Sequence, residues 1–156
     1  MCLTAVLLLA ACGVRPSGVD GGGEPPTGIA PGVTLYFVNA GGELQPQLRR
    51  TGRLGTVSEA LALLLTGPGD SGLRTEIAPA TTTRVVVTST ERVIRLMLPL
   101  TVEDVTPLGI GQIVCTTLGV HVQSGGARSM KVQVQFTQPA VESAADRTCP
   151  LISPAG

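Results

Sequence analysis

The sequence predicts an α+β fold: a two-layer sandwich in which two helices pack on one face of a mixed or antiparallel sheet of about four to five strands. Two observations carry this expectation. Runs rich in β-branched residues recur along the chain, which is typical of strands. Two segments with helical spacing lie between them. In order, the elements read β-(β)-α-β-β-α-β, and the bracketed strand has the weakest support.

The first strand is expected over residues 33–38 (VTLYFV), which lead into the turn-forming residues 39–42 (NAGG). The following segment, 43–50, has only Leu44 and Leu48 in support. It therefore predicts at most a short second strand.

The first helix is expected to begin after Thr56, because Thr56 and Glu59 have the spacing of a capping box. Apolar residues follow at helical spacing as far as Leu65. Gly67, next to Pro68, suits the left-handed position that ends a helix.

Two β-rich runs, 84–88 and 93–98, flank a short polar link and predict a hairpin. The second helix is expected to open with Thr106 as N-cap and Pro107 in its first turn. The apolar residues of this helix recur at helical spacing and form one stripe: Ile110, Ile113, Val114 and Leu118.

Glycines at positions 109 and 111 lower the helical propensity of this segment by about 1 kcal/mol each. We therefore expect them to permit close packing against a neighbouring element. The preceding pair Glu103-Asp104 is placed to complement the positive end of the helix dipole.

The last strand is expected over 131–136 (KVQVQF), whose residues alternate between apolar and polar. One face should pack on the helices, while the other meets water or a partner. A candidate partner surface therefore combines this polar face with the glycine-rich loop after the first helix: Gln133, Gln135, Gly67 and Pro68.

The N-terminal segment 3–11 is apolar but shorter than the roughly 20 residues that span a bilayer. It ends in Leu9-Ala10-Ala11-Cys12, which resembles the lipobox of bacterial lipoproteins. We expect residues 1–11 to be a signal peptide and Cys12 to carry the lipid. No Lys or Arg precedes the apolar run, so the true start is expected upstream, or the copy is truncated. A plain secretory signal and a cytosolic protein with an apolar N-terminus are the alternatives.

Residues 12–32 follow as the lipidated cysteine and a tether. Seven glycines and four prolines fall between Gly13 and Gly32, and a segment with so little apolar surface is expected to be disordered. The folded part should span 33–138, followed by an irregular tail, 139–156.

Two cysteines remain for the folded part, Cys115 and Cys149. In an oxidising compartment such a pair is expected to form a disulfide that pins the tail. Two free thiols or a partial metal site are the alternatives, although no His or Cys lies at ligand spacing from either residue, so no metal is expected. A net charge of zero argues against a nucleic-acid partner.

Five segments together resemble the GerMN domain, the family named for the sporulation and spore germination protein GerM. Residues 60–68 are similar to its "AL..LL.GP" segment and 73–79 to its "L.S.IP" connector. Residues 33–38, 93–98 and 112–118 are similar to other parts of its pattern. The resemblance covers about 33–138, in one copy where GerM has two, and no enzyme module is attached.

The resemblance implies an extracytoplasmic, lipid-anchored domain at the cell membrane, without a catalytic motif or cofactor. Its expected partner is another envelope protein or a peptidoglycan-related ligand. An accessory or sensor lipoprotein acting on a membrane kinase or transporter is the first alternative. A cell-wall hydrolase is the second, with His121, Glu103 and Asp104 as its only candidate groups; Ser58 and Ser71 have no matched base.

Overall fold

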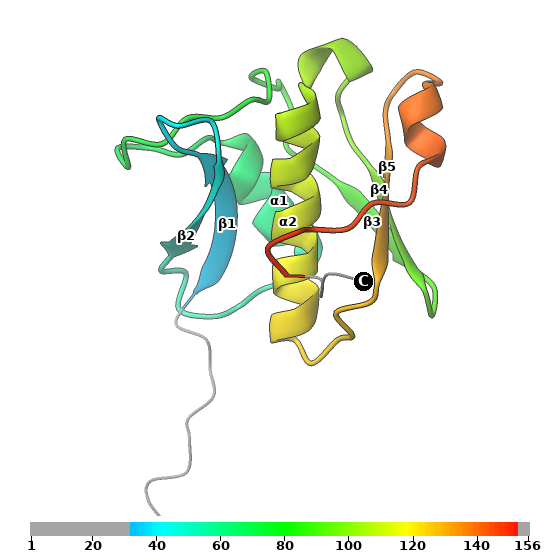
Figure 1. Cartoon of the computed structure of the whole chain (residues 1–156), viewed down its shortest axis with the longest axis horizontal. Coiled ribbons are helices and arrows are strands. Elements are labelled where there is room, and N and C mark those ends of the chain that lie inside the picture. The colour runs from blue at the N-terminus through cyan, green and yellow to red at the C-terminus, as the bar shows by residue number, and fades with distance from the viewer. Residues whose placement is uncertain (1–31, 153–156) are drawn as a thin grey trace, which may run out of the picture.

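The computed structural model describes residues 32–152 and confirms the α+β class (Figure 1). Every predicted element is present, including the weakly supported second strand. The strands and helices are β1 (Val33–Val38), β2 (Leu44–Arg49), α1 (Val57–Leu65), β3 (Val86–Ser89), β4 (Val93–Met97), α2 (Pro107–Gln123) and β5 (Lys131–Gln135). Two short 3-10 turns add η1 (Val102–Asp104) and η2 (Val141–Ala144).

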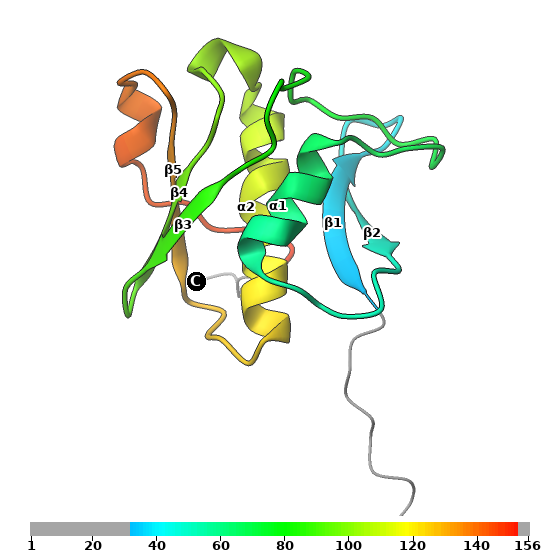
Figure 2. The same cartoon turned by 180° about the vertical axis from the view of Figure 1, so that it is seen from behind.

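The five strands form two sheets where a single sheet was expected. β1 and β2 make an antiparallel hairpin, while β3, β4 and β5 make a mixed sheet in which β4 and β5 run parallel. Helix α2 connects β4 to β5 as a crossover. Both helices pack against both sheets, and Figures 1 and 2 show α2 between them.

The division has a local cause at the outer edge of β1. Asn39 N donates to Glu43 O, and hydrogen-bonded and non-hydrogen-bonded residue pairs alternate along an antiparallel hairpin. Tyr36 therefore falls in a non-hydrogen-bonded pair, and its backbone N–H and C=O point away from β2. Tyr36 N donates to Thr116 Oγ1 at 3.0 Å, and Gln112 Nε2 donates to Tyr36 O at 3.0 Å. Side chains of α2 thus occupy the place of a neighbouring strand.

Both helix starts form as predicted. Thr56 and Glu59 make the full capping box of α1, and Thr106 Oγ1 accepts from Gly109 N at 3.1 Å at the start of α2. Gly67 follows the last turn of α1 with φ +87°, the left-handed conformation that glycine adopts without steric cost.

The core is almost entirely aliphatic, and α2 is buried along most of its length. The disulfide between Cys115 and Cys149 is present, with both residues fully buried. It joins α2 to the tail, which also pairs with β5 through a bridge between Arg147 and Val132.

Gly32 is the one residue of the expected tether that the structure describes. Gly32 is buried, and a Cβ atom there would lie 1.8 Å from the carbonyl oxygen of Arg49. Cys12, the expected signal peptide and the rest of the tether lie outside the described residues. Among residues 32–152, no helix has the length and apolar character needed to cross a membrane.

Candidate functional site

A row of three side chains, two of them apolar, crosses the outer face of the three-stranded sheet. The strand register aligns Val86 on β3 with Met97 on β4 and Gln135 on β5, so the three side chains share one face. Val86 is 51% exposed and Met97 is 54% exposed. We call this set the outer row. Exposed apolar side chains gathered in one place indicate a contact surface more strongly than single ones do.

A hollow lies on each side of Met97. One, of ≈ 430 Å³, is lined by Val86, Met97 and Phe136. The other, of ≈ 280 Å³, is lined by Met97, Gln135 and Phe136. The outer row therefore has relief into which side chains of a partner can insert.

The next row of the same face is polar and held in place. Gln133 Oε1 accepts from Arg95 Nε at 2.9 Å, and Gln133 Nε2 donates to Asp146 Oδ1 at 2.8 Å. Gln133, predicted to face a partner, thus has both ends of its amide engaged within the chain. Gln135 is the glutamine that lines a hollow.

Gly67 and Pro68 lie in the turn after α1 and contact β2 of the other sheet. The carbonyl of Gly67 accepts from Arg49 Nη2 at 2.8 Å, and that of Pro68 accepts from Gln47 Nε2 at 3.4 Å. These bonds tie the turn after α1 to β2. The four predicted surface residues therefore belong to two separate places, and of the four only Gln135 belongs to the outer row.

A further groove of ≈ 390 Å³ runs beside α1, between Val33 and Leu63. An ion pair between Arg53 and Glu59 lies on its rim. The hydrogen bond from Arg53, followed by that from the Thr56 backbone, lowers the pKa of Glu59 to about 2. The lowered pKa of Glu59 is thus accounted for by its structural role in the capping box at the start of α1, and it does not by itself indicate a functional site.

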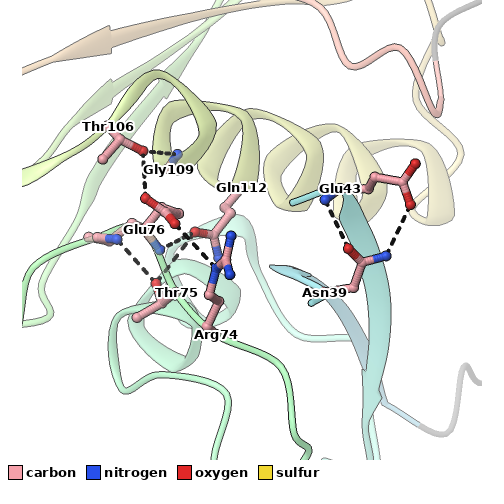
Figure 3. A network of polar contacts seen from close by, with 9 residues as sticks. Asn39, Glu43, Arg74, Thr75, Glu76, Thr106, Gly109 and Gln112 are labelled. Carbon is pink, nitrogen blue, oxygen red and sulfur yellow. Dashed lines mark hydrogen bonds and ion pairs between the residues drawn. The ribbon is translucent and has the colours of Figure 1, made fainter. Parts of the chain in front are cut away.

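A polar network at the start of α2 is also accounted for by the fold (Figure 3). Glu76 accepts from Thr106 Oγ1 at 3.2 Å and pairs with Arg74 at 3.4 Å. Gln112 Oε1 accepts from Glu76 N at 2.7 Å. These contacts fasten the segment after α1 to α2 and to the end of β1.

The candidate hydrolase residues are not brought together. Asp104 accepts from Thr101 N at 2.7 Å, which lowers its pKa, and it closes η1 rather than capping α2. His121 lies in the last turn of α2, roughly 20 Å along the helix from its start. Its Nε2 is buried and has no hydrogen-bond partner among residues 32–152, and its ring packs against Gly126.

The two serines have structural contacts. Ser58 Oγ donates to Val85 O at 2.7 Å, and Ser71 Oγ accepts from Leu73 N at 3.3 Å. Within the described part of the chain, no group of three or more His, Cys, Asp or Glu side chains could hold a metal ion.

Comparison with known proteins yields no relative: no family model matches the chain, and no curated protein or solved structure matches it significantly. The geometry of the described residues favours the outer row as the candidate site, and its apolar members Val86 and Met97 were not singled out by the sequence.

Proposed function

We propose that this chain is a lipid-anchored, extracytoplasmic binding module of the cell envelope, and that it binds another envelope protein through the outer row. The observation that carries the proposal is the exposed pair Val86 and Met97 between two hollows. Methionine is enriched at protein interfaces, and its flexible side chain adapts to irregular partners.

A protein partner is favoured over a glycan by the placement of the aromatic side chains. Among the described residues Tyr36, Phe37 and Phe136 are each at most 8% exposed, so none presents an exposed ring on which a sugar could stack, although Phe136 contributes to the walls of both hollows. Face-on binding is also favoured over strand addition at the edge of β3, because Ser58 already occupies Val85 O at one end of that edge.

The compartment is proposed from the cysteines. The disulfide Cys115–Cys149 fits an oxidising compartment, and the lipobox-like sequence ending at Cys12 supplies the anchor. Mass spectrometry of the mature N-terminus should find a diacylglyceryl group on Cys12. An unmodified Cys12 would contradict the anchor.

The binding face is tested by crosslinking in cells followed by mass spectrometry, with wild type and Met97→Glu compared. A carboxylate in the middle of the outer row should remove the main crosslinked partner, because it places a charge in an apolar contact. Val141→Glu is the matched control: Val141 is 86% exposed and lines neither hollow. If Met97→Glu folds and keeps the same partners as wild type, the outer row is not the binding face.

A further inference from the structure

Basic side chains gather at the end of the domain where the described chain begins. Arg49 lies opposite Val33 in the β1–β2 register, and Arg50 follows it. Arg53 shares the groove beside α1 with Val33. The complete set, which we call the basic end, is Arg50, Arg53, Arg92, Arg128 and Lys131. Arg49 is not a member, because its guanidinium reaches the carbonyl of Gly67 after α1.

The remaining members reach this end from the other side of the molecule. Arg128 lines a hollow together with Thr34, at the start of β1. Lys131 N donates to Arg92 O at 3.0 Å, which joins the start of β5 to the tip of the β3–β4 hairpin. Both views show these segments at the lower end of the domain (Figures 1 and 2).

The charge balance differs between the two ends. Glu59 and Glu91 accompany the basic end, and Glu59 is paired with Arg53. The opposite end, around the β1–β2 turn and the start of α2, carries mainly acidic side chains: Glu43, Glu76, Glu103 and Asp104, with Arg74 among them. A domain of nearly zero net charge is thus polarised along its length.

We infer that the basic end rests on a membrane surface of anionic lipid headgroups and so sets the orientation of the domain. Charge complementarity favours this occupant. So does the entry of the described chain at this end, because the anchor proposed at Cys12 precedes it in the sequence. Two exposed leucines lie nearby: Leu48 opposite Thr34, and Leu151 in the hollow that Arg128 lines. Each basic side chain near such a surface contributes about fivefold in binding.

The orientation has a consequence for the proposed binding face, and this part rests on the proposed function. Met97 ends β4 and Val93 begins it beside Lys131, so the outer row lies about 13 Å further from the basic end along the strand. The anchored domain would therefore hold its binding face away from the lipid.

The test uses the full chain carrying Cys12→Ser, so that no lipid is attached. Sedimentation measures the binding of the protein to phosphatidylcholine vesicles with and without phosphatidylglycerol. The readout is the binding with phosphatidylglycerol divided by the binding without it. The apolar segment 3–11 is common to all variants and cancels in their comparison. We expect a ratio well above one that falls with added salt.

Arg50→Glu/Lys131→Glu should lower that ratio roughly tenfold or more, because both side chains are exposed and neither makes a side-chain bond within the described chain. The matched control is Arg84→Glu/Arg95→Glu, which changes net charge equally at exposed positions outside the basic end. This control should lose far less.

A ratio of one for the unaltered surface, or equal losses in the two double variants, overturns the inference. The inference is also overturned if the protein binds soluble polyglutamate but does not bind the vesicles. That result would point to a polyanionic polymer as the partner. The Cys12→Ser protein carries no covalently attached lipid. A negative result in the vesicle assay therefore says nothing about the anchor at Cys12, which has its own test by mass spectrometry. An unmodified Cys12 with positive vesicle binding would instead remove only the anchor.

Discussion

At the scale of single residues, Thr116 and Gln112 act in place of a strand. Each is fully buried on α2, and together they satisfy both backbone groups of Tyr36. A buried peptide group that loses its partner costs about 1–3 kcal/mol. The stability of the β1 edge therefore depends on two buried polar side chains of a largely apolar helix.

Thr116→Val should lower the free energy of unfolding by about 1–3 kcal/mol, because it leaves the N–H of Tyr36 buried and unpaired. Thr117→Val is the matched control. Thr117 is equally buried, but its hydroxyl only donates to Ile113 O within the helix. Urea unfolding monitored by circular dichroism measures both, and equal losses would show that the Tyr36 bond contributes nothing special.

Glu59 makes stability depend on pH. Its pKa is about 2 in the folded protein against an ordinary value of 4.5, so the unfolded chain takes up the proton first as pH falls. The contribution of Glu59 is therefore complete above about pH 4.5 and is lost between that value and about pH 2.

Glu59→Gln should be less stable than wild type at neutral pH, and the difference should shrink as the pH falls and vanish near pH 2. Chemical unfolding at a series of pH values measures this. Asp104 has its pKa lowered in the same direction but is present in both proteins, so it cancels in the comparison. A difference independent of pH would contradict the assignment.

At the scale of elements, the glycines of α2 are not equivalent. A Cβ at Gly109 would lie 2.3 Å from the carbonyl oxygen of Glu76, which is backbone and cannot move aside cheaply. A Cβ at Gly119 would instead meet Tyr36 Cε2 at 3.4 Å, an ordinary contact. The close packing expected at Gly109 is thus confirmed.

Gly109→Ala should destabilise the protein despite the better helical propensity of alanine, because the segment carrying Glu76 must shift. Gly119→Ala should be neutral or stabilising by up to about 1 kcal/mol. Thermal unfolding of the two variants gives the comparison. Stabilisation by both substitutions would mean that the Glu76 segment yields freely.

The elements themselves were largely predictable because their signals are local. Alternation defined β5, and the capping residues Thr56 and Thr106 fixed the starts of both helices. The division into two sheets was not predictable, since it depends on Tyr36 pairing with Thr116, 80 positions away. Polar residues four apart in an apolar helix, Gln112 and Thr116, were the available signal.

Prediction of the candidate site was weaker, because it too depends on residues that are distant in the sequence and meet only in the folded protein. Met97 follows Arg95 at the strand period, so an apolar residue on a polar face could have been noticed. Val86 lies in an unbroken apolar run and gave no such sign. Gln133 looked free in the sequence, whereas its partners Arg95 and Asp146 come from β4 and the tail.

At the scale of the whole molecule, the disulfide joins the tail to the core. Cys115 and Cys149 are 34 positions apart, and cross-links of this span typically contribute about 2–5 kcal/mol. Reduction should therefore lower the midpoint of urea unfolding and expose the tail after β5 to proteolysis.

The control is Cys115→Ala/Cys149→Ala, which should unfold at the same urea concentration with and without reductant. Titration of free thiols in the denatured, unreduced wild type should detect neither cysteine. Insensitivity of the wild type to reductant would show that the tail is held by its β5 contacts alone.

Most strand edges of the two sheets are covered, which bears on the tendency of the protein to aggregate. The edge of β1 is covered by α2, the edge of β2 carries Pro46, and Arg147 pairs along β5. Strand-by-strand aggregation begins at open edges. Among the described strands this leaves only the short stretch Val87–Ser89 of β3 open to such pairing, so copies that collide at high concentration are expected to remain separate molecules.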